Sequence, residues 1–447
     1  MRRSPSTAQP NADGAKVGEG PSARRSPSVG LLGRLGRGIA HLAGFGDLGV
    51  LVTADVRFNF KWDLTASVLM GIAGGVIGNY MLVVARRLGA DPLLLSVIIA
   101  GSFLGSVLAI AAPYLLETEQ PAFRVALVLG VGHLVWILAL FVGAPLPYTV
   151  VTVTHHLLVG LPGPMYARIV QGAYPRPVRG RLMAGVRTAS SALALVTVPL
   201  AGVALDAVGY GATFAVAGIV GAVGSVAYAR LRILRPSVSK KPNPWKLIVS
   251  ALRNRTFRDY IIAYNVFGVS GLLIYLAMPI VLVDRFDLPF SIVGVLTLLQ
   301  GLTGLLAFPL WGQIADRKSG PAASLWSNSV GVLVALLFLV SIPLGSVWVL
   351  ALAFVARGVQ IAGYEIGWQT SVTAMAAPEE TSALTTTFLV VMGFRGLIVP
   401  FVGAALLSGL GPTGTFAVSL AIGLAGVLLM WNVARTFVPA PEEAESL

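Results

Sequence analysis

Apolar segments of about 20 residues, separated by short polar stretches, recur along the chain from residue 64 onward. An α-helix of that length crosses a hydrocarbon core of about 30 Å. A segment in lipid must satisfy its own backbone hydrogen bonds, so a chain that forms no closed barrel crosses only as helices. The pattern predicts about twelve transmembrane helices, which begin near Leu64, Leu93, Val125, Tyr148, Leu182, Thr213, Tyr260, Ser291, Ala322, Val347, Ser382 and Thr413.

The apolar pattern is also duplicated. Residues 198–205 read Val-Pro-Leu-Ala-Gly-Val-Ala-Leu, and residues 399–406, which begin 201 positions later (399 − 198), read Val-Pro-Phe-Val-Gly-Ala-Ala-Leu. The Thr-Phe-Ala-Val of residues 213–216 returns at 415–418, and Pro177 corresponds to Pro378. Collinear matches at nearly one offset indicate two similar halves in tandem.

The composition is that of a membrane protein. Of 447 residues, 56% are hydrophobic and 11% charged, and the mean hydropathy is +0.82. A soluble domain has about a quarter of its residues charged. The chain has no cysteine, which excludes disulfides and thiolate metal sites. We expect no metal and no cofactor. The phosphate-binding pattern G-x-x-x-x-G-K-[ST] does not occur in the sequence, so direct use of ATP is not indicated.

The net charge of +13 would suggest nucleic acid in a soluble domain, but its distribution favours another interpretation. Basic residues concentrate before the first predicted span, between spans four and five, and in the centre of the chain. With an even number of spans these segments share one face, which the positive-inside rule makes cytoplasmic. Arg86, Arg87 and Arg285 fall on the other face and weaken the bias. We predict an integral plasma-membrane protein with both termini cytoplasmic and no nucleic-acid partner.

The same patterns divide the chain into five parts. Residues 1–30 are rich in Ser, Pro, Gly and Arg, which is typical of a disordered segment. Apolar residues at helical spacing from Leu31 to Leu42 fit either a helix on the membrane surface or a poorly ordered linker. The predicted parts are a disordered or interfacial tail (1–60), a six-helix bundle (61–235), a cytoplasmic linker (236–258), a second six-helix bundle (259–437) and an acidic cytoplasmic tail (438–447).

The junction between predicted spans eight and nine carries a glycine and a charged cluster. Residues 312–320 read Gly-Gln-Ile-Ala-Asp-Arg-Lys-Ser-Gly. This resembles the G-x-x-x-D-R-x-G-type loop of the major facilitator superfamily (MFS), apart from the place of its last glycine. The resemblance covers residues 61–435. It implies an all-α membrane protein of twelve transmembrane helices in two pseudo-symmetric six-helix bundles. It also implies that Gly312, Asp316 and Arg317 form a gating loop; the alternative is an ordinary charged turn.

Other signals of the family are incomplete. The corresponding loop of the first half, residues 113–119, lacks the glycine and the Asp-Arg pair. Pro199 and Gly202 match only the core of the superfamily's antiporter motif. Pro400 and Gly403 repeat them in the second half, so these positions fit helix packing equally well. They are weak evidence for export.

Polar groups inside predicted spans are the candidate pathway, because ionisable groups are costly in a membrane. Arg357, Ile361 and Glu365 fall on one face of span ten. Glu365 is a candidate proton carrier, or alternatively part of a structural pair with an arginine. The resemblance implies that spans one, four, seven and ten line the cavity; the polar groups there could instead bond neighbouring helices together. The candidates are Arg357, Gln360, Tyr364, Glu365, Arg395, Asn79, Tyr80, Tyr264, Asn265 and His156.

The resemblance implies a secondary active transporter that moves a small solute by alternating access. We expect proton coupling, and the direction stays open between efflux of an amphipathic compound and uptake of an organic anion. The expected partners are the solute, a coupling ion (H⁺) and the bilayer. The alternative is a non-transporting sensor or a membrane-embedded enzyme on the same scaffold. No clustered catalytic set stands out, so we predict that the protein is not an enzyme.

Overall fold

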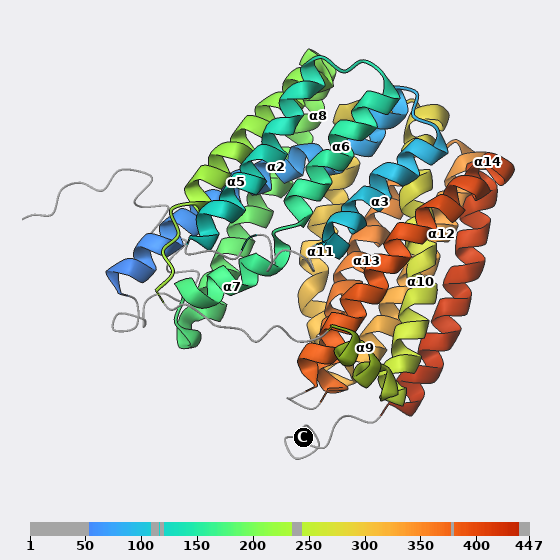
Figure 1. Cartoon of the computed structure of the whole chain (residues 1–447). Helices are drawn as coiled ribbons and strands as arrows, with labels where there is room; N and C mark the ends of the chain where they lie inside the picture. Colours follow the sequence, from blue (N-terminus) through green and yellow to red (C-terminus); the bar gives the residue numbers. More distant parts are fainter. Residues whose placement is uncertain (1–52, 109–115, 117–119, 235–243, 377–379, 438–447) are drawn as a thin grey trace, which may run out of the picture. The chain divides into compact units, whose positions relative to one another are not determined.

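The computed structural model describes residues 53–108, 116, 120–234, 244–376 and 380–437, and all regular secondary structure among them is helical (Figure 1). The unit Met1–Gly49 lies outside these residues. The elements are α2 (Ala54–Arg87), α3 (Pro92–Leu108), α5 (Pro121–Leu134), the 3₁₀ helix η3 (Val135–Leu140), α6 (Pro145–Gly160), α7 (Gly163–Ala173), α8 (Arg176–Tyr228), α9 (Pro244–Arg253), α10 (Arg255–Ile280), the π-helix η4 (Val281–Arg285), α11 (Phe290–Arg317), α12 (Gly320–Leu344), α13 (Val347–Ala374) and α14 (Thr381–Thr436).

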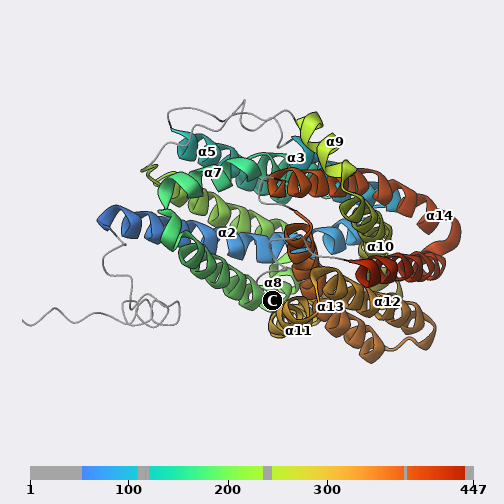
Figure 2. The ribbon, with the colours of Figure 1, turned by 90° about the horizontal axis from the view of Figure 1, so that it is seen from below.

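Within this part of the chain, eight helices are long and apolar enough to cross a membrane. Two of them, α8 and α14, are each interrupted by one non-helical residue, Gly209 and Gly411. Each therefore supplies two segments, and Figure 2 shows the two limbs of α14 on either side of its turn. Together with α3 and the α6–α7 pair, the count fits the twelve predicted spans.

The turns at Gly209 and Gly411 are the structural counterpart of the sequence repeat. Both glycines have positive φ, +79° and +65°, with ψ near 180°, a combination open almost only to glycine. The hydroxyl of Thr213 donates to the Gly209 carbonyl at 2.8 Å, and that of Thr415 donates to the Gly411 carbonyl at the same distance. The repeated sequence segments thus form the same turn in both halves of the protein.

Most helices begin at ordinary capping signals. The side chains of Asn254, Ser319 and Ser346 accept hydrogen bonds from the third backbone N–H after them. Proline opens several others, where its missing N–H costs nothing. Helix α2 begins at Ala54, ten residues before the predicted span, so its first turns fall in the range assigned to the tail 1–60. The rest of that tail, and the tail 438–447, lie outside the described residues, and α9 lies in the predicted linker.

Candidate functional site

Two pairs of helices join the first half of the protein (residues 54–234) to the second half (244–437). We call them the α8–α11 seam and the α3–α14 seam. A hydrophobic core cluster also runs through both halves, from Tyr80 of α2 to Leu276 of α10 and Phe416 of α14. These seams and this cluster hold the two halves together.

In the α8–α11 seam the backbones of the two halves touch. The carboxylate of Asp206 accepts hydrogen bonds from the backbone N–H groups of Phe290 (2.9 Å) and Ser291 (2.8 Å). It therefore caps the N-terminus of α11 from the opposite half, where a negative charge is favoured. A Cβ on Gly202 would lie 2.5 Å from the Phe290 carbonyl oxygen, and one on Gly294 would lie 3.0 Å from the Cα of Pro199. Only glycine permits this approach.

Tyr80 is placed in this seam. Its side chain is fully buried, and its hydroxyl donates to the Val198 carbonyl at 2.7 Å and lies against Gly202 and Gly294. Its neighbour Asn79 is exposed and donates to the Gly75 carbonyl of its own helix at 2.9 Å. The two residues predicted together on span one thus have different surroundings.

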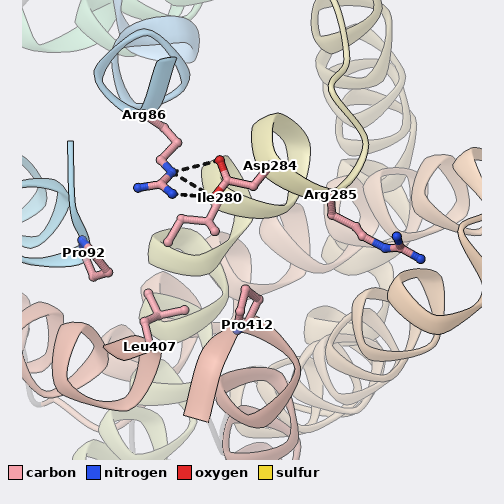
Figure 3. A pocket seen from close by; sticks show the side chains of 7 residues that line it. All are labelled: Arg86, Pro92, Ile280, Asp284, Arg285, Leu407 and Pro412. Atoms are coloured by element: carbon pink, nitrogen blue, oxygen red, sulfur yellow. Dashed lines mark hydrogen bonds and ion pairs between the residues drawn. The ribbon is translucent and has the colours of Figure 1, made fainter. Parts of the chain in front are cut away.

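Charged side chains reinforce the same end of the molecule (Figure 3). The guanidinium of Arg86, at the end of α2, grips Asp284 of η4, with Nε 3.0 Å from Oδ1 and Nη2 2.5 Å from Oδ2. Arg87 donates to the Leu288 carbonyl and stacks on the ring of Phe290 at 4.2 Å. We call this end of the molecule the Asp284 end. A hollow of about 370 Å³ opens there, lined by Arg86, Pro92, Ile280, Asp284, Arg285, Leu407 and Pro412.

The α3–α14 seam is apolar at its described contacts. The ring of Phe103 on α3 lies against Gly396 of α14, where a Cβ would collide with it. A Cβ on Gly393 would lie 3.1 Å from a methyl of Val107. Small residues therefore let the two helices approach without polar bonds.

The predicted gating loop lies at the other end of α11. This helix has 28 residues, so its two ends are about 40 Å apart. Asp316 and Arg317 are exposed, and neither bonds or ion-pairs with another described residue. Gly312 is half-buried, and a Cβ there would meet nothing within 4 Å. Of residues 113–119, the corresponding loop of the first half, only Leu116 is among the described residues.

Four predicted pathway residues come together around Arg395 of α14. Its Nη1 donates to the Tyr264 carbonyl (3.4 Å) and to Asn265 Oδ1 (3.3 Å), both on α10. Its Nη2 donates to the Tyr364 hydroxyl on α13 at 3.3 Å. The guanidinium also lies against Gly268, where any Cβ would collide with it. We call Arg395, Tyr264, Asn265 and Tyr364 the Arg395 cluster.

Aromatic rings line one side of this cluster. Tyr364 stacks on Tyr264 with ring centroids 4.2 Å apart, and Phe388 lies 4.8 Å from Tyr264. Trp368 stacks in turn on Phe388 at 4.8 Å. Tyr264 and Phe388 are fully buried, whereas Tyr364 and Trp368 are half-buried. The Arg395 guanidinium therefore lies beside a wall formed by these four aromatic rings.

Arg357 and Gln360 lie further along α13. The Arg357 guanidinium lies 5.9 Å from the centre of the Tyr275 ring, and its Nε is buried without a hydrogen-bond partner among the described residues. Gln360 is half-buried, and its backbone carbonyl accepts a hydrogen bond from the Ser327 hydroxyl at 2.8 Å. Arg357 is seven residues from Tyr364, about two helical turns.

Glu365 shares a helical face with Arg357 but is not paired with it. Eight residues along a helix separate them by about 12 Å, and no ion pair joins them in the described structure. The carboxylate is exposed and accepts from Trp368 Nε1 (3.1 Å) and from Gln369 Nε2 (2.5 Å). Arg357 therefore cannot hold the Glu365 charge directly.

Histidines cluster in the first half. The rings of His133 and His156 lie 5.6 and 5.7 Å from that of His155. His155 and His133 are each bonded to a backbone carbonyl at 2.8 Å, whereas His156 Nε2 is buried without a partner in the described structure. No group of His, Cys, Asp and Glu suited to a metal ion occurs among the described residues.

One buried acid is not among the predicted pathway residues. Asp63 of α2 is fully buried and accepts hydrogen bonds from Tyr174 (2.9 Å) and Ser67 (3.5 Å). The first span was predicted to begin at Leu64, one residue after Asp63. A helix that continues beyond its apolar core would have been the signal.

Solved structures similar to this one are transporters. A mutant of the nucleoside transporter NupG is 13% identical, with a TM-score of 0.65, over 84% of this chain and 100% of its own. A bacterial homologue of the human lysosomal transporter Spinster, inward-facing and unoccupied, is 12% identical with a TM-score of 0.67, over 87% and 100%. An auto-inhibited POT family peptide transporter is 10% identical with a TM-score of 0.66, over 87% and 98%.

At these identities the likeness concerns the fold alone, and no curated protein matches the chain in sequence. A family model gives the sequence relationship. The model of the Major Facilitator Superfamily matches residues 64–363, about two thirds of the chain. The helical architecture and the transporter neighbours agree with that match. The chain therefore belongs to the Major Facilitator Superfamily.

Proposed function

We propose that this protein is a secondary active transporter that moves a small solute by alternating access of its two halves. One observation carries the proposal. The halves are joined at the Asp284 end by Arg86, Arg87 and Asp206, whereas the loop with Asp316 and Arg317 at the other end is exposed and bonded to no other described residue. One end closed and the other released is what an alternating-access state requires.

The proposal includes an orientation. With twelve spans and both termini cytoplasmic, the Asp284 end faces outward and the described state opens toward the cytoplasm. The many basic residues at the other end support this orientation through the positive-inside rule. The similar structure of the Spinster homologue is also inward-facing. We place the protein in the plasma membrane.

We further propose that transport is coupled to protons. Glu365 is the acid on the exposed face of α13, next to the Arg395 cluster. An exposed carboxylate can exchange protons with water in an open state. The direction of transport is read from the sign of solute accumulation under an imposed pH gradient. A sensor would not need to alternate between states that are closed at opposite ends of the molecule. An enzyme would need a set of catalytic residues.

Distances between spin labels at both ends test alternating access. Because the chain contains no cysteine, labels can be placed without removing native thiols. One pair at the Asp284 end joins Leu93→Cys and Trp348→Cys, both exposed; a second pair at the other end joins Arg181→Cys and Gln313→Cys. We expect reciprocal changes between pH 5.5 and pH 8, with one pair shortening as the other lengthens. Two invariant distances would contradict the proposal.

Transport itself is measured in proteoliposomes. A panel of labelled solutes is tested with and without an imposed pH gradient. The unmodified protein is compared with Asp316→Asn, a variant in the predicted gating loop. Accumulation that follows the gradient supports proton coupling, and its sign gives the direction. Equal accumulation with and without the gradient would contradict coupling.

A further inference from the structure

Two arginines inside the spans of the second half have no acidic partner among the described residues. Arg395 donates only to neutral oxygens, and Arg357 faces an aromatic ring. Glu365 is held by Trp368 and Gln369 and pairs with neither. A cation within a membrane protein is costly unless an opposite charge compensates it, and such residues mark solute pathways. The missing negative charge is the first pointer to a ligand.

The guanidinium of Arg395 is held in place but not saturated. Its three hydrogen bonds are 3.3–3.4 Å long, beyond the usual range for a charged donor, and its Nε is buried with no partner in the described structure. Three helices and the bare backbone at Gly268 fix its plane. Three of its five N–H groups are used, and the two that remain fit a planar carboxylate, which accepts two parallel bonds.

The surroundings indicate the rest of the ligand. Tyr364 and Trp368, both half-buried, lie on an aromatic wall with Tyr264 and Phe388. The half-buried rings of Tyr364 and Trp368, which stack on the fully buried Tyr264 and Phe388, favour an apolar or aromatic body over a small hydrophilic ion. Gly396, the residue after Arg395, lies against Phe103 of the first half, so the cluster borders a seam that must move.

We infer that the Arg395 cluster binds the carboxylate of an amphipathic organic anion, whose apolar body lies against the half-buried rings of Tyr364 and Trp368. This inference rests on the proposed function, since it names the class of solute. It unites the two solute classes that the sequence left open, an amphipathic compound and an organic anion. Arg357, about two turns away on α13, adds a positive potential without touching the same carboxylate.

The test is ligand binding to the purified full-length protein, measured as thermal stabilisation. The probes are sodium benzoate, phenylacetate and hexanoate, each compared with its neutral amide and with sodium chloride at equal concentration. We expect a saturable rise in Tm with the carboxylates and none with the amides, since binding to the folded state alone stabilises it. Equal effects of acids and amides, or no effect of any carboxylate, would overturn the inference.

Variants locate the site. Arg395→Gln should weaken carboxylate binding by about tenfold or more, the usual loss for a charge-assisted bond. Arg395→Lys, which keeps the charge but loses the fork, covers the case in which the glutamine variant does not fold, and it too should bind more weakly. Arg285→Gln is the matched control, because Arg285 also donates only to a neutral carbonyl, that of Ile342, but lies at the Asp284 end.

The outcomes separate the two proposals. Unchanged binding in both Arg395 variants, or an equal loss in Arg285→Gln, would overturn the assignment of the site. The spin-label distances are measured without any solute. Reciprocal distance changes with no carboxylate binding would support alternating access and refute only the inference that the solute is an organic anion.

Discussion

Arg86 and Asp284, which lie in different halves of the protein, form a two-pronged ion pair at the Asp284 end, with Nη2 2.5 Å from Oδ2. The two side chains are 24% and 39% exposed, so solvent screens the pair. Such pairs contribute about 1 kcal/mol or less. We propose that the pair biases the equilibrium between the two access states without locking it.

Asp284→Asn should therefore open the Asp284 end slightly. We expect a population shift of roughly two- to fivefold toward the outward-open state, which corresponds to about 0.5–1 kcal/mol. The measurement is the distance distribution between labels at Leu93→Cys and Trp348→Cys. Exchanging the partners, Arg86→Asp with Asp284→Arg, should restore part of the original distribution. A single substitution with no effect on that distribution would count against a gating role.

The cap on α11 should matter more than the ion pair. Asp206→Ala leaves two backbone N–H groups, those of Phe290 and Ser291, without their acceptor, and losing such a cap costs about 1 kcal/mol. Asp206→Asn keeps one acceptor oxygen and should retain much of the effect. We expect the alanine variant to favour the open Asp284 end more than the asparagine variant in the same label measurement. Equal shifts in the two variants would show that charge alone is at work, because both remove the negative charge.

Gly202 and Gly403 are repeat-equivalent positions with different surroundings. A Cβ on Gly202 meets the backbone of the opposite half, whereas one on Gly403 meets the ends of Leu276 (2.8 Å) and Leu273 (3.0 Å) in its own half. Gly202→Ala should disfavour the closed seam by about 1–3 kcal/mol, the usual cost of overpacking. Gly403→Ala, where flexible side chains can yield, should leave the state distribution unchanged and alter only Tm. Equal shifts in both variants would contradict the seam.

The proton role of Glu365 gives a fourth prediction. Glu365→Gln should abolish accumulation driven by a pH gradient but retain solute exchange between preloaded proteoliposomes and medium, because a neutral amide still fills the same position. The folded yield should be normal, since the carboxylate is exposed and bonded only to Trp368 and Gln369. Glu380→Gln, at the start of α14, is the control. Gradient-driven accumulation at the normal level would exclude Glu365 as the carrier.

Much of the fold could be predicted from the sequence, because lipid imposes a single length and a single type of element on each span. The duplicated Thr-Phe-Ala-Val segments predicted two similar halves, and the structure shows that each segment begins four residues after a turn, at Gly209 and Gly411. The closed end could not be predicted in this way. Arg86 and Arg87 counted only as charges on the wrong side of a topology rule, and Asp206 lies 84 residues from the backbone groups that it caps.

The candidate site shows a similar division. Polarity inside spans selected Arg395, Tyr264, Asn265 and Tyr364 one by one, but only the packing of three helices shows that they meet. Helical periodicity put Arg357 and Glu365 on one face, where an ion pair was one of the interpretations. Their separation along the axis prevents it. Asp63 escaped notice because a buried acid near a helix end looks like a solvated one when only local polarity is considered.

The two seams differ in chemistry, and this makes the state of the protein depend on its ionic medium. The Asp206 cap in the α8–α11 seam and the Arg86–Asp284 ion pair between α2 and η4 weaken as ionic strength rises, because mobile ions screen partly exposed charges. The Phe103–Gly396 contact of the α3–α14 side is apolar and is strengthened by strongly hydrated salts such as sulfate. Raising the concentration of sodium chloride should therefore weaken the charged contacts of the Asp284 end alone, and sulfate should strengthen the apolar α3–α14 seam. The populations of the two access states would then differ between concentrated sodium chloride and dilute buffer.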